Sequence, residues 1–318
     1  MSGSVVVRTP CRLHFGMFSF GQPDRPQFGG VGAMIEPPCV EVSFTRAERF
    51  EAHGALAIRA KQFVELATRN WGLDGLPACA IEVRSPGDHT GLGVGTQLGL
   101  AVAAGLRRFL KLPELSIETL AASVGRGRRS AIGTYGFQQG GLIVDAGKEA
   151  GGELGKLSQR VELPSEWRFV LVRPPSVQGR AGENEAAAFA SLPPVSDGVT
   201  RELWRITNEQ MLPAVERADC EAFGEAVFRF GTLAGECFAG AQGGVFASSQ
   251  IATLVAAIRS FGVAGTGQSS WGPTVFAVVA DDPAAQRLSG RLQTQACSRE
   301  CDITIAKPNN LGATITST

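Results

Sequence analysis

The 318-residue sequence has no excess of either charge, since 30 Lys and Arg residues stand against 30 Asp and Glu residues. A near-neutral chain lacks the overall field that draws a protein to nucleic acid or to an anionic membrane, so we expect neither as a partner. No apolar run approaches the roughly 20 residues of a membrane span. A basic segment followed by a long apolar one, which would mark a secretory signal, is also missing near the N-terminus. These absences favour a cytoplasmic location.

Cysteine and histidine show no spacing typical of a metal site. None of the seven cysteines forms a CxxC pair, and the closest two are Cys297 and Cys301. The three histidines, His14, His53 and His89, have no ligand spacing among themselves. An odd number of scattered cysteines is typical of a reduced, cytosolic protein, so we expect no structural zinc and no disulfide framework.

Glycine is abundant, with 40 residues, and one glycine-rich motif directly precedes a helix-like segment. It runs from Gly91 to Gln97 and reads GLGVGTQ, after a strand-like stretch at 80–83. Apolar residues then recur at helical spacing from Leu98 to Leu110. Glycines let the backbone turn tightly and direct its N–H groups to one place, and the helix adds the positive end of its dipole. The motif therefore predicts a phosphate site, although a glycine-rich turn without a ligand remains the alternative.

The remaining pattern predicts an α+β protein of two domains, 1–165 and 166–318, because the chain is long for a single core. The boundary precedes a strand at 169–173 that is stopped by Pro174 and Pro175. Pro213 is expected to kink the first long helix of the second domain. The other expected strands are 5–7, 40–44, 140–147, 274–279 and 302–306, and the expected helices are 57–70, 116–124, 200–218, 219–238, 249–261 and 286–297.

Neither of the best-known phosphate fingerprints is present, since the chain has no GxxxxGK[ST] and GLGVG lacks the third glycine of GxGxxG. The order of three segments is informative instead: RLHFG at 12–16, the glycine motif, and a late glycine-rich loop before a strand. This order resembles the GHMP superfamily, whose members are chiefly small-molecule kinases. The details resemble β-ribofuranosylaminobenzene 5′-phosphate synthase within it, over nearly the whole chain. They are HTGLGVGTQ at 89–97, GRG at 125–127, SAIG at 130–133, GGLIVD at 140–145 and, most specifically, GQSSWGP at 267–273.

The resemblance implies a two-domain GHMP kinase-like fold, with an N-terminal domain like domain 2 of ribosomal protein S5 and a ferredoxin-like α+β C-terminal domain. It also implies a transferase that condenses phosphoribosyl pyrophosphate with 4-aminobenzoate, releases CO₂ and pyrophosphate, and serves methanopterin biosynthesis. Gly133 stands where kinases of the superfamily commonly place a catalytic aspartate. An ATP-dependent GHMP small-molecule kinase is the alternative, and a non-catalytic ligand-binding protein is a third.

Several residues suit the chemistry of this transfer. Negative charge grows on the departing pyrophosphate, so backbone N–H groups of the glycine motif and guanidinium groups are the natural stabilisers. We expect the phosphate or pyrophosphate site to comprise Gly91, Leu92, Gly93, Val94, Gly95, Thr96, Gln97, Arg126 and Arg128. The basic segment that holds both arginines and Arg129 would otherwise be ordinary solvated surface.

The other candidate residues surround the two substrates. Trp271 is a candidate aromatic wall for the benzoate, with Gln268, Ser269 and Ser270 as polar contacts. His14 and Arg12 are the candidate catalytic residues, His14 as a proton donor or phosphate contact. Glu183 is a candidate for the ribose hydroxyls, and Asp145 for a Mg²⁺ ion near pyrophosphate. Core packing of Trp271 and His14, a solvated helix start for Glu183 and a turn role for Asp145 are the alternatives. We expect no ATP and a homodimer.

Overall fold

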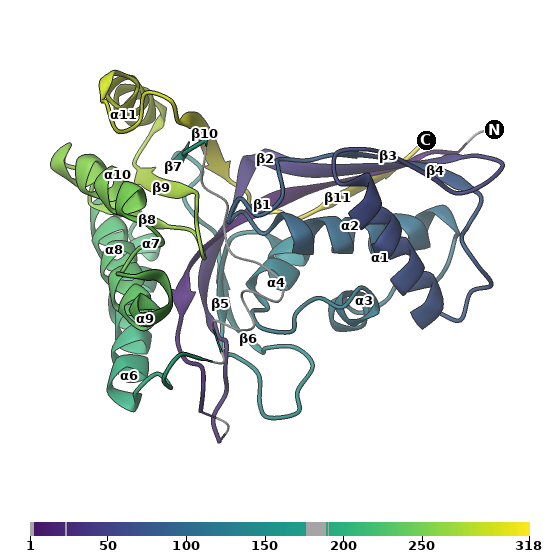
Figure 1. Ribbon diagram of the computed structural model, residues 1–318, viewed down its shortest axis with the longest axis horizontal. Coiled ribbons are helices and arrows are strands. Elements are labelled where there is room, and N and C mark those ends of the chain that lie inside the picture. The colour runs from purple at the N-terminus through teal and green to yellow at the C-terminus, as the bar shows by residue number, and fades with distance from the viewer. Residues whose placement is uncertain (1–2, 23, 176–188, 190) are drawn as a thin grey trace.

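A single branched β-sheet connects the two halves of the chain (Figure 1). The computed structural model describes residues 3–22, 24–175, 189 and 191–318. In this part of the chain the sheet has 11 strands, with the path β11-β1-β2-β10-β7-β9-β8 and with β4–β3 and β5–β6 branching from β2. The strands are β1 (Val5–Met17), β2 (Gly30–Arg46), β3 (Glu51–Gly54), β4 (Cys79–Arg84), β5 (Leu142–Asp145), β6 (Leu157–Val161), β7 (Arg168–Arg173), β8 (Gly265–Gln268), β9 (Val275–Val279), β10 (Asp302–Pro308) and β11 (Thr314–Ser317).

The helices divide between the two ends of this sheet. In Figure 1, α1 to α4 lie at the end that holds both termini, and α6 to α11 lie at the opposite end. Their bounds are α1 (Ala57–Asn70), α2 (Val94–Phe109), α3 (Ile117–Ser123), α4 (Ile132–Gln139), α6 (Asp197–Arg205), α7 (Leu212–Glu216), α8 (Cys220–Glu236), α9 (Ala239–Gln242), α10 (Ser249–Ser260) and α11 (Asp282–Thr294). Within the described residues, no helix has the length and apolar content needed to cross a bilayer.

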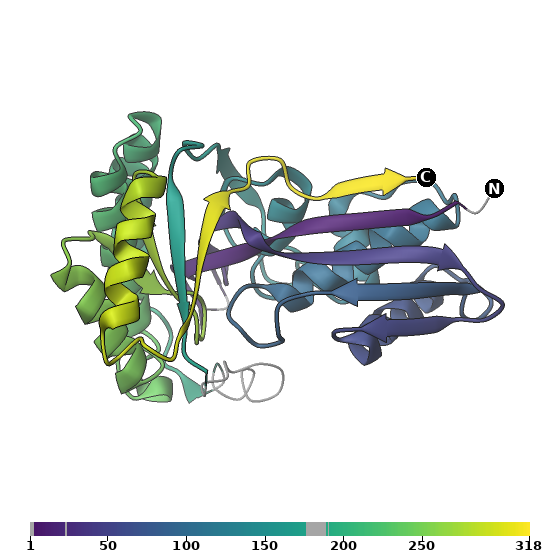
Figure 2. The ribbon, with the colours of Figure 1, turned by 90° about the horizontal axis from the view of Figure 1, so that it is seen from above.

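Strand β1 is paired along its whole length on one edge but only partly on the other (Figure 2). Strand β2 pairs with it from Val5 to Met17, whereas β11 covers the opposite edge only from Val5 to Arg8. From residue 9 onward this second edge has no strand partner among the described residues. Its N–H and C=O groups therefore need partners from loops, because unpaired buried backbone groups are costly.

The two halves share hydrophobic core. One buried cluster joins Phe15 of β1 to Phe223 of α8 and Phe276 of β9, with ring centroids 6.4 Å and 5.2 Å from that of Phe15. A second cluster fills the space between β7, β9, α10 and α11. Strand β10 pairs with both β2 and β7, and β11 returns to β1, so the C-terminal residues cross back to the first half. The boundary at residue 165 stays a prediction.

Proline shapes the helical segment that follows α6. A π-helical stretch, η1 (Ile206–Met211), separates α6 from α7, and Pro213 lies at the start of α7. Proline has no N–H to donate to the carbonyl four residues earlier, and a wider turn accommodates that loss. The predicted kink at Pro213 stays a prediction, and the structure shows a π-helical turn directly before this residue.

Sequence patterns located the regular elements well and the glycine-rich ones poorly. The helix predicted over 57–70 is α1 with the same bounds. Strands β1 and β2 are much longer than the predicted 5–7 and 40–44, because Pro10, Gly30 and Gly32 are accommodated inside them. The sequence did not predict α4, β8 or β11. All seven cysteines lie in described segments and are free thiols.

Candidate active site

Three segments far apart in the sequence meet at the open edge of β1. The Arg12 N–H donates a hydrogen bond to the carbonyl of Leu92, at 2.9 Å. Two residues later, the His14 N–H donates to Ser269 Oγ at 3.0 Å, and the His14 carbonyl accepts from the Ser270 N–H at 3.0 Å. The glycine motif and the loop before β9 therefore complete the strand that β11 leaves open. The structure brings together the motifs at 12–16, 91–97 and 267–273.

The glycine motif forms the start of α2, as the sequence predicted. Gly93 is the N-cap residue in the left-handed conformation with φ of 71°, and no side chain caps the helix. The first N–H groups of an uncapped helix need partners from outside it, which is what a bound anion supplies. A Cβ atom on Gly91, whose φ is +81°, would lie 2.6 Å from the Ser269 carbonyl oxygen. Glycine at 91 therefore lets the two loops touch.

Side chains of the motif point mostly into the protein. Leu92 and Val94 belong to the main core, and Gln97 is fully buried. The Gln97 amide accepts from Thr9 Oγ1 and donates to the Gly133 carbonyl at 2.8 Å. The backbone of this motif is thus better placed for a ligand than its side chains, and the contact expected from the Gln97 amide stays a prediction.

Gly133 lies beside this helix start, as its proposed alignment with a kinase aspartate requires. A Cβ atom on Gly133 would be 3.2 Å from Thr96 Cγ2 and 3.4 Å from Gln97 Nε2. An aspartate here would crowd both residues, and glycine supplies no carboxylate. The kinase alternative accordingly has less support.

The arginines of the motifs have different surroundings. Arg12 packs against Gly93, where a Cβ atom would meet Arg12 Cβ and Nε at 3.1 Å each. The Arg126 guanidinium lies 4.7 Å from the ring centre of Phe63 on α1, and Arg129 lies 5.3 Å from that of Phe189. Arg128 is exposed. Arg12 and Arg126 therefore lie near the glycine motif, while the role of Arg128 stays a prediction.

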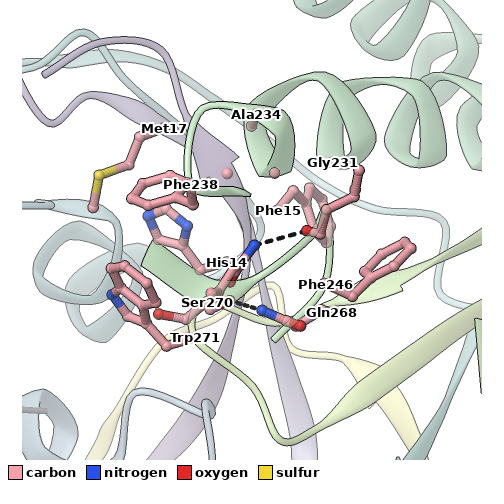
Figure 3. Close-up of a pocket in the computed structure, with 14 residues that line it drawn as sticks. His14, Phe15, Met17, Gly231, Ala234, Phe238, Phe246, Gln268, Ser270 and Trp271 are labelled. Carbon is pink, nitrogen blue, oxygen red and sulfur yellow. Dashed lines mark hydrogen bonds between the residues drawn. The ribbon is translucent and has the colours of Figure 1, made fainter. Parts of the chain in front are cut away.

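An aromatic pocket lies next to the open edge of β1 (Figure 3). His14, Phe238 and Trp271 line one side of it, with Phe246 and Gln268 across the space. The ring of Trp271 meets that of Phe238 edge to face, with centroids 4.9 Å apart. Such a pocket suits a planar aromatic ring, because aromatic walls bury it and offer favourable edge contacts. The placement of Trp271 agrees with its expected role as a wall.

Two polar side chains of the loop before β9, Gln268 and Ser269, already make hydrogen bonds within the protein. The Gln268 amide donates to the Ser270 carbonyl and accepts from the Ala247 N–H, each at 2.7 Å. Ser269 Oγ donates to the Gly91 carbonyl at 2.8 Å, so this fully buried side chain ties the two loops together. Gln268 and Ser269 thus hold the loop in shape, and Ser270 faces the pocket.

His14 also lines the pocket, with a buried imidazole ring. It is 3% exposed, and its Nε2 atom has no hydrogen-bond partner among the described residues. Burial, and secondly the nearby Arg12 guanidinium, lower the pKa of His14 well below its ordinary value. The ring is therefore neutral near pH 7 in the unliganded protein, where it can accept or donate a hydrogen bond but holds no extra proton to give.

Asp145 does not fit the magnesium site proposed for it. Its Oδ2 accepts from the Ala131 N–H at 2.7 Å and its Oδ1 from the Gly147 N–H at 2.8 Å. Burial raises the pKa of this carboxyl to about 6, against the opposing effect of these bonds. Within the described segments, no group of three or more His, Cys, Asp or Glu residues could hold a metal. Asp145 instead anchors the start of α4, which is the turn role given as its alternative.

One predicted site residue lies outside the described residues, and four residues near the motifs were not predicted. Glu183 lies in the segment 176–188, outside the described residues. Arg59, Phe238, Phe246 and Gln242 were missed. Their positions on helices or in a short connecting segment resemble ordinary surface or core positions, and only the folded chain brings them to the motifs.

Comparisons with known proteins agree with this geometry. A family described as GHMP kinases C terminal matches residues 211–298. The chain is 32% identical to a beta-ribofuranosylphenol 5′-phosphate synthase of Archaeoglobus fulgidus, over 97% of this chain and 98% of that protein. It is 28% identical to the protein of the same name from Methanothermobacter thermautotrophicus, over 88% and 90% of the two chains.

Solved structures support the fold. Mevalonate pyrophosphate decarboxylase from Streptococcus pyogenes superposes with a TM-score of 0.70 at 11% identity, over 97% of each chain. The expected α+β GHMP fold is therefore confirmed, as are the resemblance and the expectation of a synthase-type enzyme. The chain belongs to the beta-ribofuranosylphenol 5′-phosphate synthase family, within the GHMP superfamily.

Proposed function

We propose that this enzyme condenses phosphoribosyl pyrophosphate with a 4-substituted benzoate, forming a ribofuranosyl-arene 5′-phosphate and releasing CO₂ and pyrophosphate. The names of the relatives support a product that joins ribose 5′-phosphate to a phenol ring. The observation that carries the proposal is the open edge of β1, where the glycine motif and the aromatic pocket adjoin the same short stretch of strand.

The spacing along β1 suits a donor and an acceptor that must touch. Arg12 and His14 are two residues apart in a regular stretch of strand, so their side chains share one face and lie about 7 Å apart along it. Arg12 packs on the glycine motif, and His14 lines the aromatic pocket. A phosphoribosyl donor with its pyrophosphate at the start of α2 would direct its anomeric carbon toward the ring in the pocket.

The reaction then needs positioning and charge stabilisation more than a protein nucleophile. The bond from the anomeric carbon to pyrophosphate breaks, and the leaving group takes the electron pair. The ring carbon that bears the carboxylate attacks the anomeric carbon. Loss of CO₂ returns the electron pair of the broken C–C bond to the ring and restores aromaticity. The neutral His14 ring can hydrogen-bond the acceptor substituent or the ribose.

The acceptor substituent is either a hydroxyl or an amine. The sequence resemblance points to 4-aminobenzoate, whereas a ribofuranosylphenol product points to 4-hydroxybenzoate. Either substituent releases electrons to the attacking carbon, and either can hydrogen-bond His14 Nε2. We propose that the enzyme uses an acid of this pair, and competition between the two at equal concentration would identify the preferred one.

The direct test is incubation of the purified protein with phosphoribosyl pyrophosphate and each acid. Equal amounts of CO₂ and pyrophosphate, together with a product of the expected mass, would support the proposal. If the protein releases neither CO₂ nor pyrophosphate, and instead consumes ATP in the presence of a small alcohol, the kinase alternative would replace the proposed condensation. The same assay with EDTA or with added Mg²⁺ tests whether the reaction uses the ion. Assays with and without ATP test the expectation that the reaction does not use ATP.

The proposal includes a homodimer in the cytoplasm. Light scattering after size-exclusion chromatography tests the oligomeric state, and fractionation of cells of the source organism tests the location.

A further inference from the structure

Two arginines outside the aromatic pocket flank the first turns of α2. Arg59 comes from α1, and Arg126 follows α3. Both guanidinium groups lie over the ring of Phe63, with Cζ 6.0 Å and 4.7 Å from its centre. A Cβ atom on Gly95 would be 2.5 Å from Arg59 Nη2, and one on Gly99 would be 3.4 Å from Arg126 Cγ. The two arginines thus reach the same helix start that the glycine motif forms.

Positive charge is in excess at this position. Arg59 pairs with Asp88 through Nη1, and the two side chains are 26% and 24% exposed. Arg126 Nε is buried and has no hydrogen-bond partner in the described part of the chain. Burial, and then the neighbouring charge of Arg59, lower the pKa of Arg126 to about 10. Two guanidinium groups and the positive end of α2 therefore face one carboxylate, an arrangement that an anion would stabilise.

Packing holds both arginines directly against α2. Gly95 and Gly99 leave no side chain between α2 and the two arginines. Arg59 and Asp88 also line an open cavity with Gln62 and His89, and neither Arg126 nor the glycine motif lines it. The guanidinium faces rest on Phe63, which orients them without using their N–H donors.

We infer that Arg59 and Arg126 form a clamp that binds the departing pyrophosphate at the start of α2, with Asp88 orienting Arg59. This role rests on the proposed function. Two guanidinium forks and a helix start offer donors for both phosphoryl groups, so the clamp favours a diphosphate over a monophosphate. As the bond to the anomeric carbon breaks, the electron pair moves to the diphosphate, and the clamp stabilises the added charge.

The test measures pyrophosphate binding without turnover. Calorimetric titration of the unmodified protein with inorganic pyrophosphate and with inorganic phosphate is compared with the variants Arg59→Gln and Arg126→Gln. Each variant should weaken pyrophosphate binding by about tenfold or more, because a charge-assisted hydrogen bond is lost. Arg69→Gln is the matched control, since Arg69 lies exposed in the last turn of the same helix as Arg59. It should leave binding unchanged.

Pyrophosphate affinity tests the clamp, and condensation activity tests the proposed function. Melting curves without ligand establish that each variant folds. If Arg126→Gln does not fold, Arg126→Lys keeps the charge, loses the planar fork and should bind with intermediate affinity. Unchanged pyrophosphate affinity in folded Arg59 and Arg126 variants overturns the clamp, even if condensation proceeds. Arginine-dependent pyrophosphate binding in a protein that shows no condensation supports the clamp and counts against the proposed function.

Discussion

His14 is the residue whose environment differs most from what the sequence alone implies. Its ring is almost fully buried beside Arg12, and its pKa is lowered well below the ordinary value. Below about pH 6.5 the unfolded chain therefore binds a proton at this histidine that the folded chain does not. The free energy of unfolding therefore holds its full value above about pH 6.5, as far as His14 is concerned, and falls as the pH drops below that value.

Replacement of His14 by Gln should reduce the loss of stability between pH 7 and pH 5. Melting temperatures across this range, in unmodified protein and in His14→Gln, measure the effect. His53→Gln is the control, because the His53 side chain is 56% exposed. A pH dependence that is identical in all three proteins would contradict the buried, neutral state of His14.

Trp271 is the second residue with a specific expected effect. Trp271→Ala removes one wall of the aromatic pocket, so the KM for the benzoate should rise by about tenfold or more, while the KM for phosphoribosyl pyrophosphate should change little. Trp271→Phe keeps an aromatic wall and should retain most of the affinity. Steady-state kinetics with each substrate varied in turn separate the two effects, and equal changes in both KM values would argue against the pocket as the acceptor site.

At the scale of elements, the contact between the glycine motif and the loop before β9 determines the site. The sequence predicted both loops and the helix after the first of them. It did not predict that Ser269 would bind the Gly91 carbonyl or that Thr274 Oγ1 would donate to the Thr90 carbonyl at 2.6 Å. These contacts join residues 178 and 184 positions apart, and no periodic pattern in the sequence predicts them.

Gly91→Ala should therefore damage more than the local backbone. A non-glycine residue with φ near +81° costs about 1–2 kcal/mol of stability. The added Cβ would also meet the Ser269 carbonyl at 2.6 Å and separate the loops. We expect pyrophosphate binding to fall by about tenfold or more, a loss comparable to that of one charge-assisted hydrogen bond.

Gly75→Ala is the matched control for this substitution. Gly75 has a similar φ of +77°, but a Cβ atom there has no neighbour within 4 Å. It should cost similar backbone strain, measured by chemical denaturation, and leave pyrophosphate affinity unchanged. Equal loss of affinity in both variants would mean that general destabilisation, and not the contact between loops, explains the result.

At the scale of the whole molecule, the C-terminal strand β11 covers part of one edge of β1. Strand β11 pairs with Val5 to Arg8 of β1, so residues at the two ends of the chain form one edge. A chain that ends at Gly312 would leave this edge of β1 open to water and to other strands. Loss of four cross-strand residue pairs should lower the free energy of unfolding by roughly 2–4 kcal/mol and promote aggregation.

Urea denaturation and light scattering measure these two effects of truncation. Ile315→Thr is the control, because it removes a side chain that is 43% exposed and keeps the strand. If the truncated protein is as stable and as soluble as the full-length protein, the pairing of β11 with β1 does not stabilise the fold.

The family, the helix at 57–70, the strand and helix around the glycine motif and the loops that form the site were all predicted from the sequence. These features depend on local spacing: glycines where the backbone turns, apolar residues at helical intervals, and a distinctive run such as GQSSWGP. The role of Trp271 as an aromatic wall stays a prediction, and the structure places its side chain in the pocket. The two partners of Asp145 were not predicted, because the N–H groups of Ala131 and Gly147 are backbone groups that composition does not reveal.

Three features became visible only in the folded chain: the loops that bond to the open edge of β1, the arginines that face α2, and the pairing of the C-terminal strand. Arg59 shows the reason most clearly. In the sequence it is one basic residue in an amphipathic helix, and in the fold it lies beside Gly95, Asp88 and Phe63. Contacts of this kind depend on how helices pack across the sheet, and the energy that selects them comes from burial and charge pairing across the whole chain.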